Sequence, residues 1–290
     1  RDYFSKCAAN TEHLTNYSTL NSARDLEILR SVLGDKKLNF LGKSYGTYLG
    51  TLYAELFPES VGRFVLDGAV DPNASNREAM LGQATGFESA LKAFISNCLK
   101  RSSCTLTGDL PTAQNQVIDL LAKTAITPLK SKSGREVTEG LVLLGIASAL
   151  YDSESGWPVL RDAFKEATLG SGESFLTLAD QYAGRQENGS YLSNENDALQ
   201  VIDCLDQNEL EPISTFKRGL AEFSEQAPIF GPYLAYAGLA CRYLPNLGSV
   251  EQIELKKLNT ERVLIIGTTR DPATPYKWAQ SLTKIFTGSI

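Results

Sequence analysis

One serine of this sequence stands between two glycines, where a short apolar segment passes into a helical pattern. Residues 39–58 read NFLGKSYGTYLGTLYAELFP, so Gly42, Ser44 and Gly46 form a G-x-S-x-G motif. A tight strand-to-helix turn can project such a serine hydroxyl above the edge of a sheet as a nucleophile. We expect both glycines to remove side chains that would clash with the adjoining strand and helix. The motif predicts a catalytic Ser44, although glycine-rich turns without catalytic function share it.

The residue after this serine supplies a second element of the chemistry. Tyr45 opens the predicted helix, where backbone N–H groups have no helical partner and the helix dipole is positive. Such an N–H can stabilise an oxyanion that develops during attack on a carbonyl. We therefore predict Tyr45 as a backbone donor to the oxyanion.

A nucleophilic serine also requires a base, and the base requires a carboxylate that orients it. Asp271 follows the apolar segment ERVLIIG and precedes PATPY, which opens a helix. Carboxylates just past the carboxyl end of a parallel strand lie where such sheets bind ligands. We predict Asp271 as the acid of a catalytic triad; the alternatives are a helix-capping role for Asp271 and Asp67 as the acid.

The base is missing from the expected place. The sequence has a single histidine, His13, in a polar stretch ahead of Ser44. A triad of this type runs in the order serine, acid, histidine. We therefore expect His13 to be a surface or loop residue, and the catalytic histidine to lie outside these 290 residues.

The composition excludes several classes of protein. The chain is 42% hydrophobic and 21% charged, with a formal net charge of −6, which disfavours a nucleic-acid binder. The longest apolar run, GLVLLGIASALY, is shorter than the roughly 20 residues needed to span a bilayer. The cysteines form no C-x-x-C pair, so no metal site is expected, and no cofactor is implied.

The five cysteines can be read in two ways. Cys98 and Cys104 flank a short polar loop and could close it, and Cys204 could pair with Cys241, while Cys7 would remain over. The alternative is that all five are buried free thiols. Disulfides would favour an oxidising location, either secreted or in the cell envelope.

The order of elements predicts an α/β fold. A helix over Ser22–Gly34, with Ser22 as its N-cap, precedes a strand over Lys37–Leu41, a helix over Tyr45–Phe57 and a strand over Arg63–Leu66. Alternation of this kind is typical of a parallel sheet covered by helices. Helical patterns without strands then follow, over Arg77–Lys100, Pro111–Ala125, Thr138–Tyr151, Pro158–Leu169, Glu173–Ala183, Asn196–Leu205 and Thr215–Glu225. A strand over Glu261–Gly267 and a helix over Tyr276–Phe286 close the sequence.

These segments resemble a known family. LGKSYGTYLGTLYAELFPESVGRFVLDGAVDP and GTTRDPATPYKWAQSLTKIF are similar to the secreted tripeptidyl aminopeptidase group of the α/β-hydrolase superfamily, relatives of the prolyl aminopeptidases. ALQVIDCLD and LACRYLP resemble the group's two cysteine-bearing segments, which implies a Cys204–Cys241 disulfide. The resemblance implies a partial sheet core over residues 1–74 and 251–290, with a helical cap over residues 75–250. The group's glycine-rich oxyanion segment and its catalytic histidine have no counterpart, so we expect a chain truncated at both ends.

The resemblance implies an exported serine exopeptidase that releases short peptides from free N-termini through an acyl-enzyme on Ser44. Asp203 or Asp206 is a candidate for binding the substrate's amino group, while ordinary helix-surface charges are the alternative. An esterase or lipase on the same fold is a second hypothesis, because the fold does not decide the substrate. A non-catalytic binding protein is a third. The expected partner is a peptide; the sequence does not indicate the oligomeric state.

Overall fold

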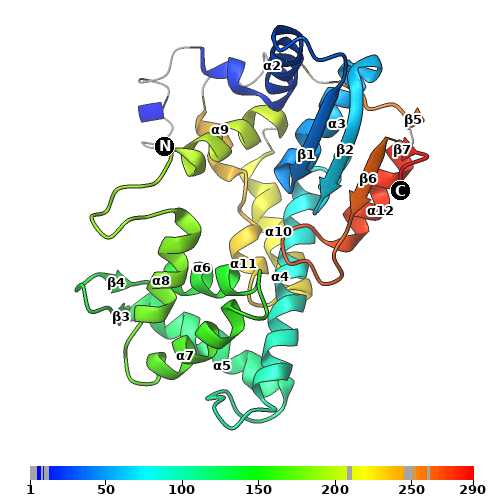
Figure 1. The fold of residues 1–290 in the computed structure, drawn as a ribbon. Coiled ribbons are helices and arrows are strands. Elements are labelled where there is room, and N and C mark those ends of the chain that lie inside the picture. Colours follow the sequence, from blue (N-terminus) through cyan, green and yellow to red (C-terminus); the bar gives the residue numbers. More distant parts are fainter. Residues whose placement is uncertain are drawn as a thin grey trace. The chain divides into compact units, whose positions relative to one another are not determined.

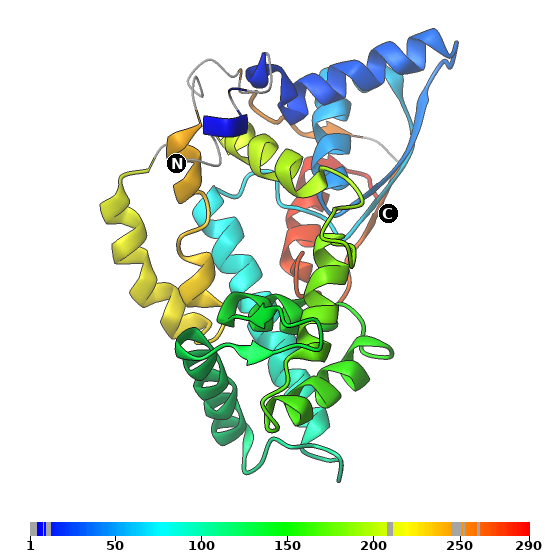
Figure 2. The ribbon, with the colours of Figure 1, turned by 90° about the vertical axis from the view of Figure 1, so that its left-hand side faces the viewer.

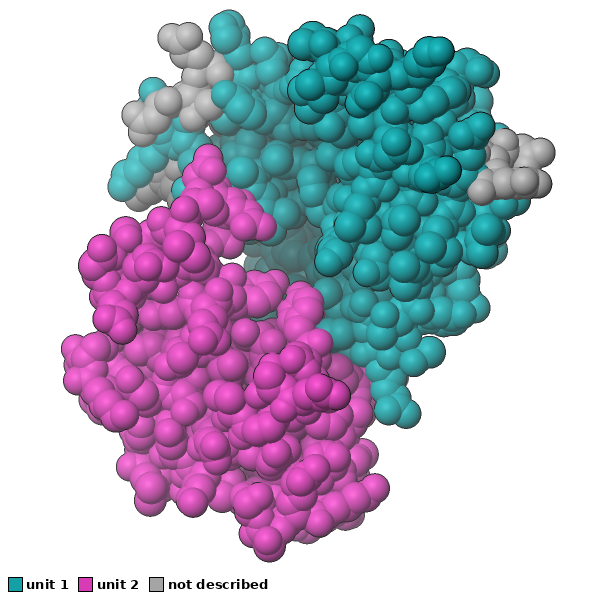
Figure 3. All heavy atoms as spheres, in the orientation of Figure 1, with its two compact units in different colours: residues 1–86, 197–226, 231–290 teal, residues 87–196, 227–230 magenta. Residues whose placement is uncertain are grey.

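The computed structural model describes residues 5–7, 9, 13–207, 211–244, 251, 253–259 and 262–290. The chain divides into two compact units, which Figure 3 shows in different colours. Unit 1 comprises residues 1–86, 197–226 and 231–290, and unit 2 comprises residues 87–196 and 227–230. Residues 75–86, 197–226 and 231–250 of the predicted cap thus belong to unit 1, which also contains residues 1–74 and 251–290. The cap itself stays a prediction.

Unit 1 is built on a parallel sheet of three strands in the order β1-β2-β6. The strands are β1 (Leu38–Lys43), β2 (Val61–Asp67) and β6 (Val263–Ile266). Their arrows point the same way in Figure 1. All three carboxyl ends therefore meet at one edge, where the register aligns Lys43 with Asp67 and Asp67 with Ile266.

The two faces of this sheet differ in burial. Phe64 and Val263 are each 1% exposed and share one face, packed against α3 (Tyr45–Leu56) and α12 (Tyr276–Ile285). Figure 2 shows both helices on the same side of the strands. On the opposite face Leu41 is 61% exposed and Leu264 39% exposed. The core of unit 1 thus lies between the sheet and these two helices.

Helix α2 (Thr19–Val32) packs against α3 and begins earlier than the sequence pattern predicts. Its N-cap is Ser18, whose hydroxyl accepts a hydrogen bond from the Asn21 N–H. Ser22, the predicted N-cap, lies inside the helix, so that prediction was wrong. Two capping-type serines flank this start, and only the three-dimensional structure decides which one caps it.

The other elements of unit 1 are short or peripheral to the sheet. They include α9 (Glu195–Gln207), whose Cys204 is joined by a disulfide to Cys241 of η3 (Leu239–Tyr243). These elements are η1 (Leu14–Tyr17), η2 (Pro58–Ser60), α9 (Glu195–Gln207), α10 (Ile213–Gln226), α11 (Gly231–Leu234), η3 (Leu239–Tyr243), β5 (Leu258–Asn259) and β7 (Phe286–Thr287).

Unit 2 is mostly helical. An aromatic cluster joins Phe94, Trp157, Phe164 and Phe175, with ring centroids 5.5–6.0 Å apart. Gly145 lets α6 (Glu139–Ala149) approach α8 (Glu173–Ala183) closely, because an added Cβ would lie 2.6 Å from the Phe175 carbonyl oxygen. The elements are the later part of α4 (Asn76–Cys98), then α5 (Leu110–Ile126), β3 (Leu129–Lys130), β4 (Glu136–Val137), α6 (Glu139–Ala149), α7 (Gly156–Ala167) and α8 (Glu173–Ala183).

Most predicted elements have a counterpart within a few residues. The predicted helical segments correspond to α4 through α10, and the strand at the end of the sequence corresponds to β6, although its predicted first residue, Glu261, lies outside the described residues. No strand was expected among the helices, yet β3 and β4 form a two-stranded antiparallel sheet. Two-residue strands leave too short a period to detect in sequence.

Two disulfides join cysteines in the described part of the chain. Cys98 is bonded to Cys104 within unit 2, and Cys204 is bonded to Cys241 within unit 1. In each pair the Cα atoms are 5.2 Å apart. Cys7 carries no disulfide. Among the described residues, no helix is both long enough and apolar enough to cross a membrane.

Candidate active site

Ser44 lies at the point where β1 ends and α3 begins, and it is exposed. Its backbone has φ 52° and ψ −120°. Only three non-glycine residues in the described part of the chain have positive φ, namely His13, Ser44 and Arg270. A side chain in this region strains the backbone, and such strain persists where surrounding contacts enforce it.

Four hydrogen bonds enforce the conformation of this turn. The Ser44 N–H donates to the Asp67 carbonyl oxygen, 3.0 Å away at the end of β2. The Ser44 carbonyl accepts from the Thr47 N–H at 2.9 Å and from Thr47 Oγ1 at 2.7 Å. Thr47 Oγ1 in turn accepts from the Val70 N–H at 2.9 Å. Because the peptide is planar and trans, fixing the Ser44 carbonyl directs the Tyr45 N–H the opposite way.

The two glycines of the motif have different environments. A Cβ added to Gly42 would lie 2.4 Å from the Gly46 carbonyl oxygen and 2.7 Å from the Phe40 ring. Gly42 therefore permits the close approach of strand and helix. A Cβ added to Gly46 would meet no atom within 4 Å. The expected clash at Gly46 was wrong, because it is the main chain of Gly46, rather than its missing side chain, that crowds Gly42.

Asp271 lies on the loop that follows β6. Its Oδ1 accepts from the N–H groups of Ala273 at 3.0 Å and Thr274 at 2.8 Å, which folds the loop around the carboxylate. Helix α12 starts only at Tyr276, with Pro275 as its N-cap and no side-chain cap bond. The alternative that Asp271 caps this helix was therefore wrong.

Gly68 lies between Asp271 and Ser44. A Cβ built on Gly68 would be 3.8 Å from Asp271 Oδ2 and 3.8 Å from the Ser44 nitrogen, which bounds the separation of those two atoms at twice that distance. It would also lie 3.0 Å from Thr274 Oγ1. With φ 64°, Gly68 adopts a conformation that disfavours side chains, and its N–H donates to the Ile266 carbonyl at 3.0 Å. The fold thus brings the two predicted catalytic residues to one place.

The first part of α4, which belongs to unit 1, supports the Asp271 loop. Gln83 Nε2 donates to the Ala273 carbonyl at 3.1 Å. A Cβ added to Gly86 would lie 2.5 Å from the Pro272 carbonyl oxygen, so the helix and the loop are in close contact. Arg270, directly before Asp271, has φ 62°. Two of the strained residues of the described chain therefore flank or form this site.

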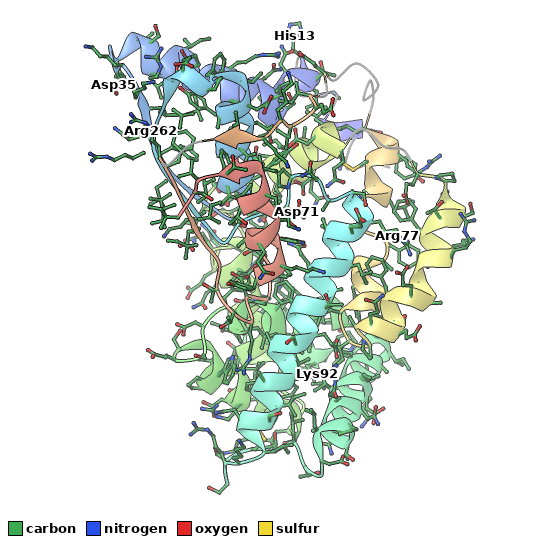
Figure 4. All side chains as sticks on the ribbon, turned by 90° about the vertical axis from the view of Figure 1, so that its right-hand side faces the viewer. His13, Asp35, Asp71, Arg77, Lys92 and Arg262 are labelled. Atoms are coloured by element: carbon green, nitrogen blue, oxygen red, sulfur yellow. A yellow bond between two sulfur atoms is a disulfide. The ribbon has the colours of Figure 1, made fainter. Side chains whose placement is uncertain are left out.

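Asp67 and His13 take other places. Asp67 was the alternative acid, and the structure shows its main-chain carbonyl accepting from the Ser44 N–H, so its backbone shapes this turn. His13 is exposed and precedes η1, and within the described residues its side chain has no hydrogen-bond partner. Figure 4 shows it at the outer end of the N-terminal segments. Among the described residues, no hydrogen bond joins His13 to the Ser44 turn.

Two carboxylates of α9 lie near the residue that follows the serine. Asp206 accepts hydrogen bonds from Thr19, and Thr19 Oγ1 also lies 2.5 Å from the Tyr45 hydroxyl. Burial raises the pKa of Tyr45 to about 12, with further contributions from Asp206 and Asp203. Burial, followed by the charge of Asp206, raises the pKa of Asp203 to about 6. Burial also raises the pKa of Asp206.

Sequence reasoning missed several residues of this site. Gly68 had a readable signal, a glycine directly after the strand residue Asp67, whereas Thr19 had none. Thr47 could have been noticed as a hydroxyl close behind the motif. In the described part of the chain, no group of three histidine, cysteine, aspartate or glutamate residues could hold a metal ion.

The model of a protein family described as the alpha/beta hydrolase fold matches residues 4–289. The chain belongs to this family. The parallel sheet, the strained serine after β1 and the aspartate after β6 accord with that membership.

The relatives of this chain bear the names of different kinds of hydrolase. The chain is 33% identical to the serine protease Hip1 of Mycobacterium tuberculosis over 292 residues, covering 96% of this chain and 55% of the relative. It is 30% identical to the tripeptidyl aminopeptidase of Streptomyces lividans over 297 residues, covering 100% of this chain and 54% of the relative. A Mycobacterium tuberculosis protein named carboxylesterase B is 33% identical over 269 residues, covering 91% and 51%. The chain thus spans about half the length of the curated relatives it matches.

Proposed function

We propose that this chain carries the nucleophile and acid of a serine exopeptidase, with Ser44 as nucleophile and Asp271 as triad acid. The observation that carries the proposal is the exposed serine held at φ 52° between β1 and α3. An ordinary turn would place glycine at such a conformation, so a serine there indicates a role for its hydroxyl. The position of Asp271 Oδ2 beside Gly68 supports the pairing.

The proposed reaction proceeds through an acyl-enzyme. Ser44 Oγ attacks the carbonyl carbon of the scissile peptide bond, while its proton passes to a histidine base that Asp271 orients. The Tyr45 N–H donates to the oxyanion. The base returns the proton to the leaving amine as the C–N bond breaks, and water then hydrolyses the acyl-enzyme. We propose that the base comes from outside these 290 residues, because among the described residues no hydrogen bond joins His13, the single histidine, to the Ser44 turn.

Release of short peptides from free N-termini requires recognition of an ammonium group. The carboxylates of Asp203 and Asp206 lie in unit 1 with Ser44, and Asp206 reaches Tyr45 through Thr19. Thr19 occupies an acceptor position on each Asp206 oxygen, whereas Asp203 has no hydrogen-bond partner in the described chain. Asp203 is therefore the freer acceptor for a substrate amine. The names of two relatives, a serine protease and a tripeptidyl aminopeptidase, support the substrate class.

The proposal includes a location and a cap. Disulfides persist in oxidising compartments, so the two in this chain favour a secreted or cell-envelope protein. The helical segments within residues 75–250 would limit access to Ser44 to the ends of peptides.

A labelling and cleavage experiment tests the proposal. The natural protein that contains this chain is treated with a fluorophosphonate, and the adduct is mapped by mass spectrometry, with Ser44→Ala as the control. Cleavage of tripeptide anilides with free and N-acetylated termini is then compared. We expect labelling at Ser44 and strong preference for the free terminus. Absence of labelling would favour a non-catalytic binding protein, and equal rates on both substrates would exclude the aminopeptidase.

An esterase is the second candidate function, and the relative named carboxylesterase B favours it. The same serine, acid and oxyanion donor serve ester hydrolysis. Turnover of acyl esters without turnover of any peptide would select this function.

A further inference from the structure

A chain of hydrogen bonds runs from the candidate oxyanion donor to a residue far along the sequence. The Tyr45 hydroxyl lies 2.5 Å from Thr19 Oγ1, and Thr19 Oγ1 donates to Asp206 Oδ2 at 2.5 Å. A threonine hydroxyl has one hydrogen. Since an ionised carboxylate only accepts, Thr19 gives that hydrogen to Asp206, and the Tyr45 hydroxyl must donate to Thr19.

The far end of this chain is firmly held. Asp206 Oδ1 also accepts from the Thr19 N–H at 2.8 Å, so two bonds join Asp206 to the first residue of α2. That N–H is one of the helix-terminal donors without an intrahelical partner, and a carboxylate there is favoured by the helix dipole. Thr19 is fully buried. Cys204, two positions before Asp206 on α9, is tied to Cys241.

The near end belongs to the turn that carries the nucleophile. The peptide plane between Ser44 and Tyr45 is fixed on one side by Thr47, which donates twice to the Ser44 carbonyl. The Tyr45 side chain, held by Thr19, fixes the α-carbon on the other side. Burial raises the pKa of Tyr45 to about 12, so the phenol keeps its proton and remains a donor.

We infer that Asp206 is a positioning residue for the oxyanion site: through Thr19 Oγ1 it fixes the Tyr45 side chain and thereby the direction of the Tyr45 backbone N–H. This inference rests on the proposed function. It differs from recognition of a substrate amine by Asp206, because a positioning role acts on every substrate. A displaced donor loses its bond to the oxyanion, which forms only in the transition state, so kcat falls while KM stays.

Kinetics on a neutral acyl ester, which has no amino group, test the inference in the natural protein. Thr19→Val keeps the side-chain shape and removes the hydroxyl, and Tyr45→Phe removes the phenolic hydroxyl and keeps the ring. Thr19→Ser retains a hydroxyl at position 19. We expect the first two to lower kcat by about tenfold, less than the 10²–10³ of a deleted oxyanion donor, with KM unchanged. The double variant should be no worse than the poorer single one, because both remove the same link. Thr19→Ser should retain at least half of kcat.

The matched control is Thr124→Val in α5. Thr124 is also a buried threonine, 1% exposed, and its Oγ1 donates to the Leu120 carbonyl at 3.0 Å, but it lies in unit 2. Thr124→Val should lower the free energy of unfolding, measured with urea, by about as much as Thr19→Val does, and it should leave kcat unchanged. Equal losses of kcat in Thr124→Val and Thr19→Val would overturn the inference.

Asp206→Asn separates positioning from amine recognition. We expect a lowered kcat on the neutral ester and on free peptides alike. A raised KM confined to substrates with a free amine would overturn the inference and assign Asp206 to direct binding.

A measurement that does not depend on catalysis tests the inference independently of the proposed function. The amide resonance of Tyr45 is followed by NMR in the wild type, Thr19→Val and Thr124→Val. We expect Thr19→Val, and not Thr124→Val, to shift this resonance. An unchanged Tyr45 amide would overturn the inference even in an active enzyme. A wild type without turnover would contradict the proposed function, and the amide would still decide the positioning link.

Discussion

The backbone N–H of Ser44 donates a hydrogen bond to the carbonyl oxygen of Asp67, 3.0 Å away. This bond continues the β1–β2 ladder by one residue beyond the point where the chain leaves β1 at φ 52°. The strained serine is therefore anchored to the sheet as well as to the following helix through Thr47. The conformation that exposes its hydroxyl depends on the strand ends and on close packing behind the turn.

We expect Gly42→Ala and Gly46→Ala to differ sharply. The new methyl group at Gly42 would lie 2.4 Å from the Gly46 carbonyl oxygen, whereas at Gly46 it would meet no atom within 4 Å. Gly42→Ala should lower the free energy of unfolding by about 1–3 kcal/mol and abolish phosphonate labelling of Ser44. Gly46→Ala should be neutral within about 0.5 kcal/mol and keep labelling. Urea unfolding and mass spectrometry measure both, and equal behaviour of the two variants would contradict this account of the turn.

Asp271→Asn and Asp67→Asn separate the triad acid from its neighbour. Asparagine at position 271 would leave the loop bonds to Ala273 and Thr274 largely intact but would misorient the base, so kcat should fall by about 10⁴. Asp67 serves the turn through its main-chain carbonyl, which asparagine retains. We expect less than a tenfold loss there. Steady-state kinetics of the natural protein decide, and a larger loss at Asp67 would reverse the assignment.

The stability of the chain should depend on the ionisation of Asp203. Burial and then the Asp206 charge raise its pKa to about 6, from 3.8. Because the folded state binds this proton more tightly than the unfolded state, the contribution of Asp203 to stability is fully present below about pH 4 and is lost as the pH rises through about 6. The loss is at most about 3 kcal/mol.

Asp203→Asn removes that ionisation. The variant should match the wild type near pH 4 and exceed it by about 1–3 kcal/mol near pH 7.5, as measured by urea unfolding at both pH values. Asp119→Asn, which removes an exposed carboxylate on α5, is the control and should show no such difference. A variant less stable than the wild type at the higher pH would rule out the explanation.

Glu88 joins two distant parts of unit 2. It is 1% exposed, and its Oε2 accepts from the N–H groups of Ile229 at 3.0 Å and Phe230 at 3.4 Å, while Oε1 accepts from Gln114 Nε2 at 3.1 Å. Glu88→Ala leaves the two backbone donors without this acceptor and should cost about 3–5 kcal/mol. Glu88→Gln keeps an acceptor and should cost less than about 1.5 kcal/mol.

The same pair of variants has a pH signature. Burial raises the pKa of Glu88, so the wild type loses stability as pH rises through its folded pKa, and Glu88→Gln should not. Urea unfolding across this range measures the difference. If Glu88→Gln were as damaging as Glu88→Ala, the carboxylate charge rather than the acceptor geometry would hold the segment.

The local features of this protein could be predicted from sequence, because their signals lie in consecutive residues. A strand, a G-x-S-x-G motif and a helix in succession predict the strand-to-helix turn at Ser44. The position of Asp271 on a loop was predicted because it comes directly after an apolar strand. The helical segments of unit 2 were likewise readable from apolar spacing. These features depend on interactions within one or two turns of chain.

The tertiary structure alone decided which of two similar residues performs a role. Ser18 rather than Ser22 caps α2, and Gly42 rather than Gly46 needs to lack a side chain. It also decided that Asp206 reaches Tyr45 through a threonine 187 positions away. Such contacts join segments that only folding brings together. The sequence shows which residues can form hydrogen bonds, but it does not show which residue each of them will bond to. The residues that predict a nucleophilic serine thus lie next to it in the sequence, whereas the contacts that hold the serine in place depend on the packing of distant elements.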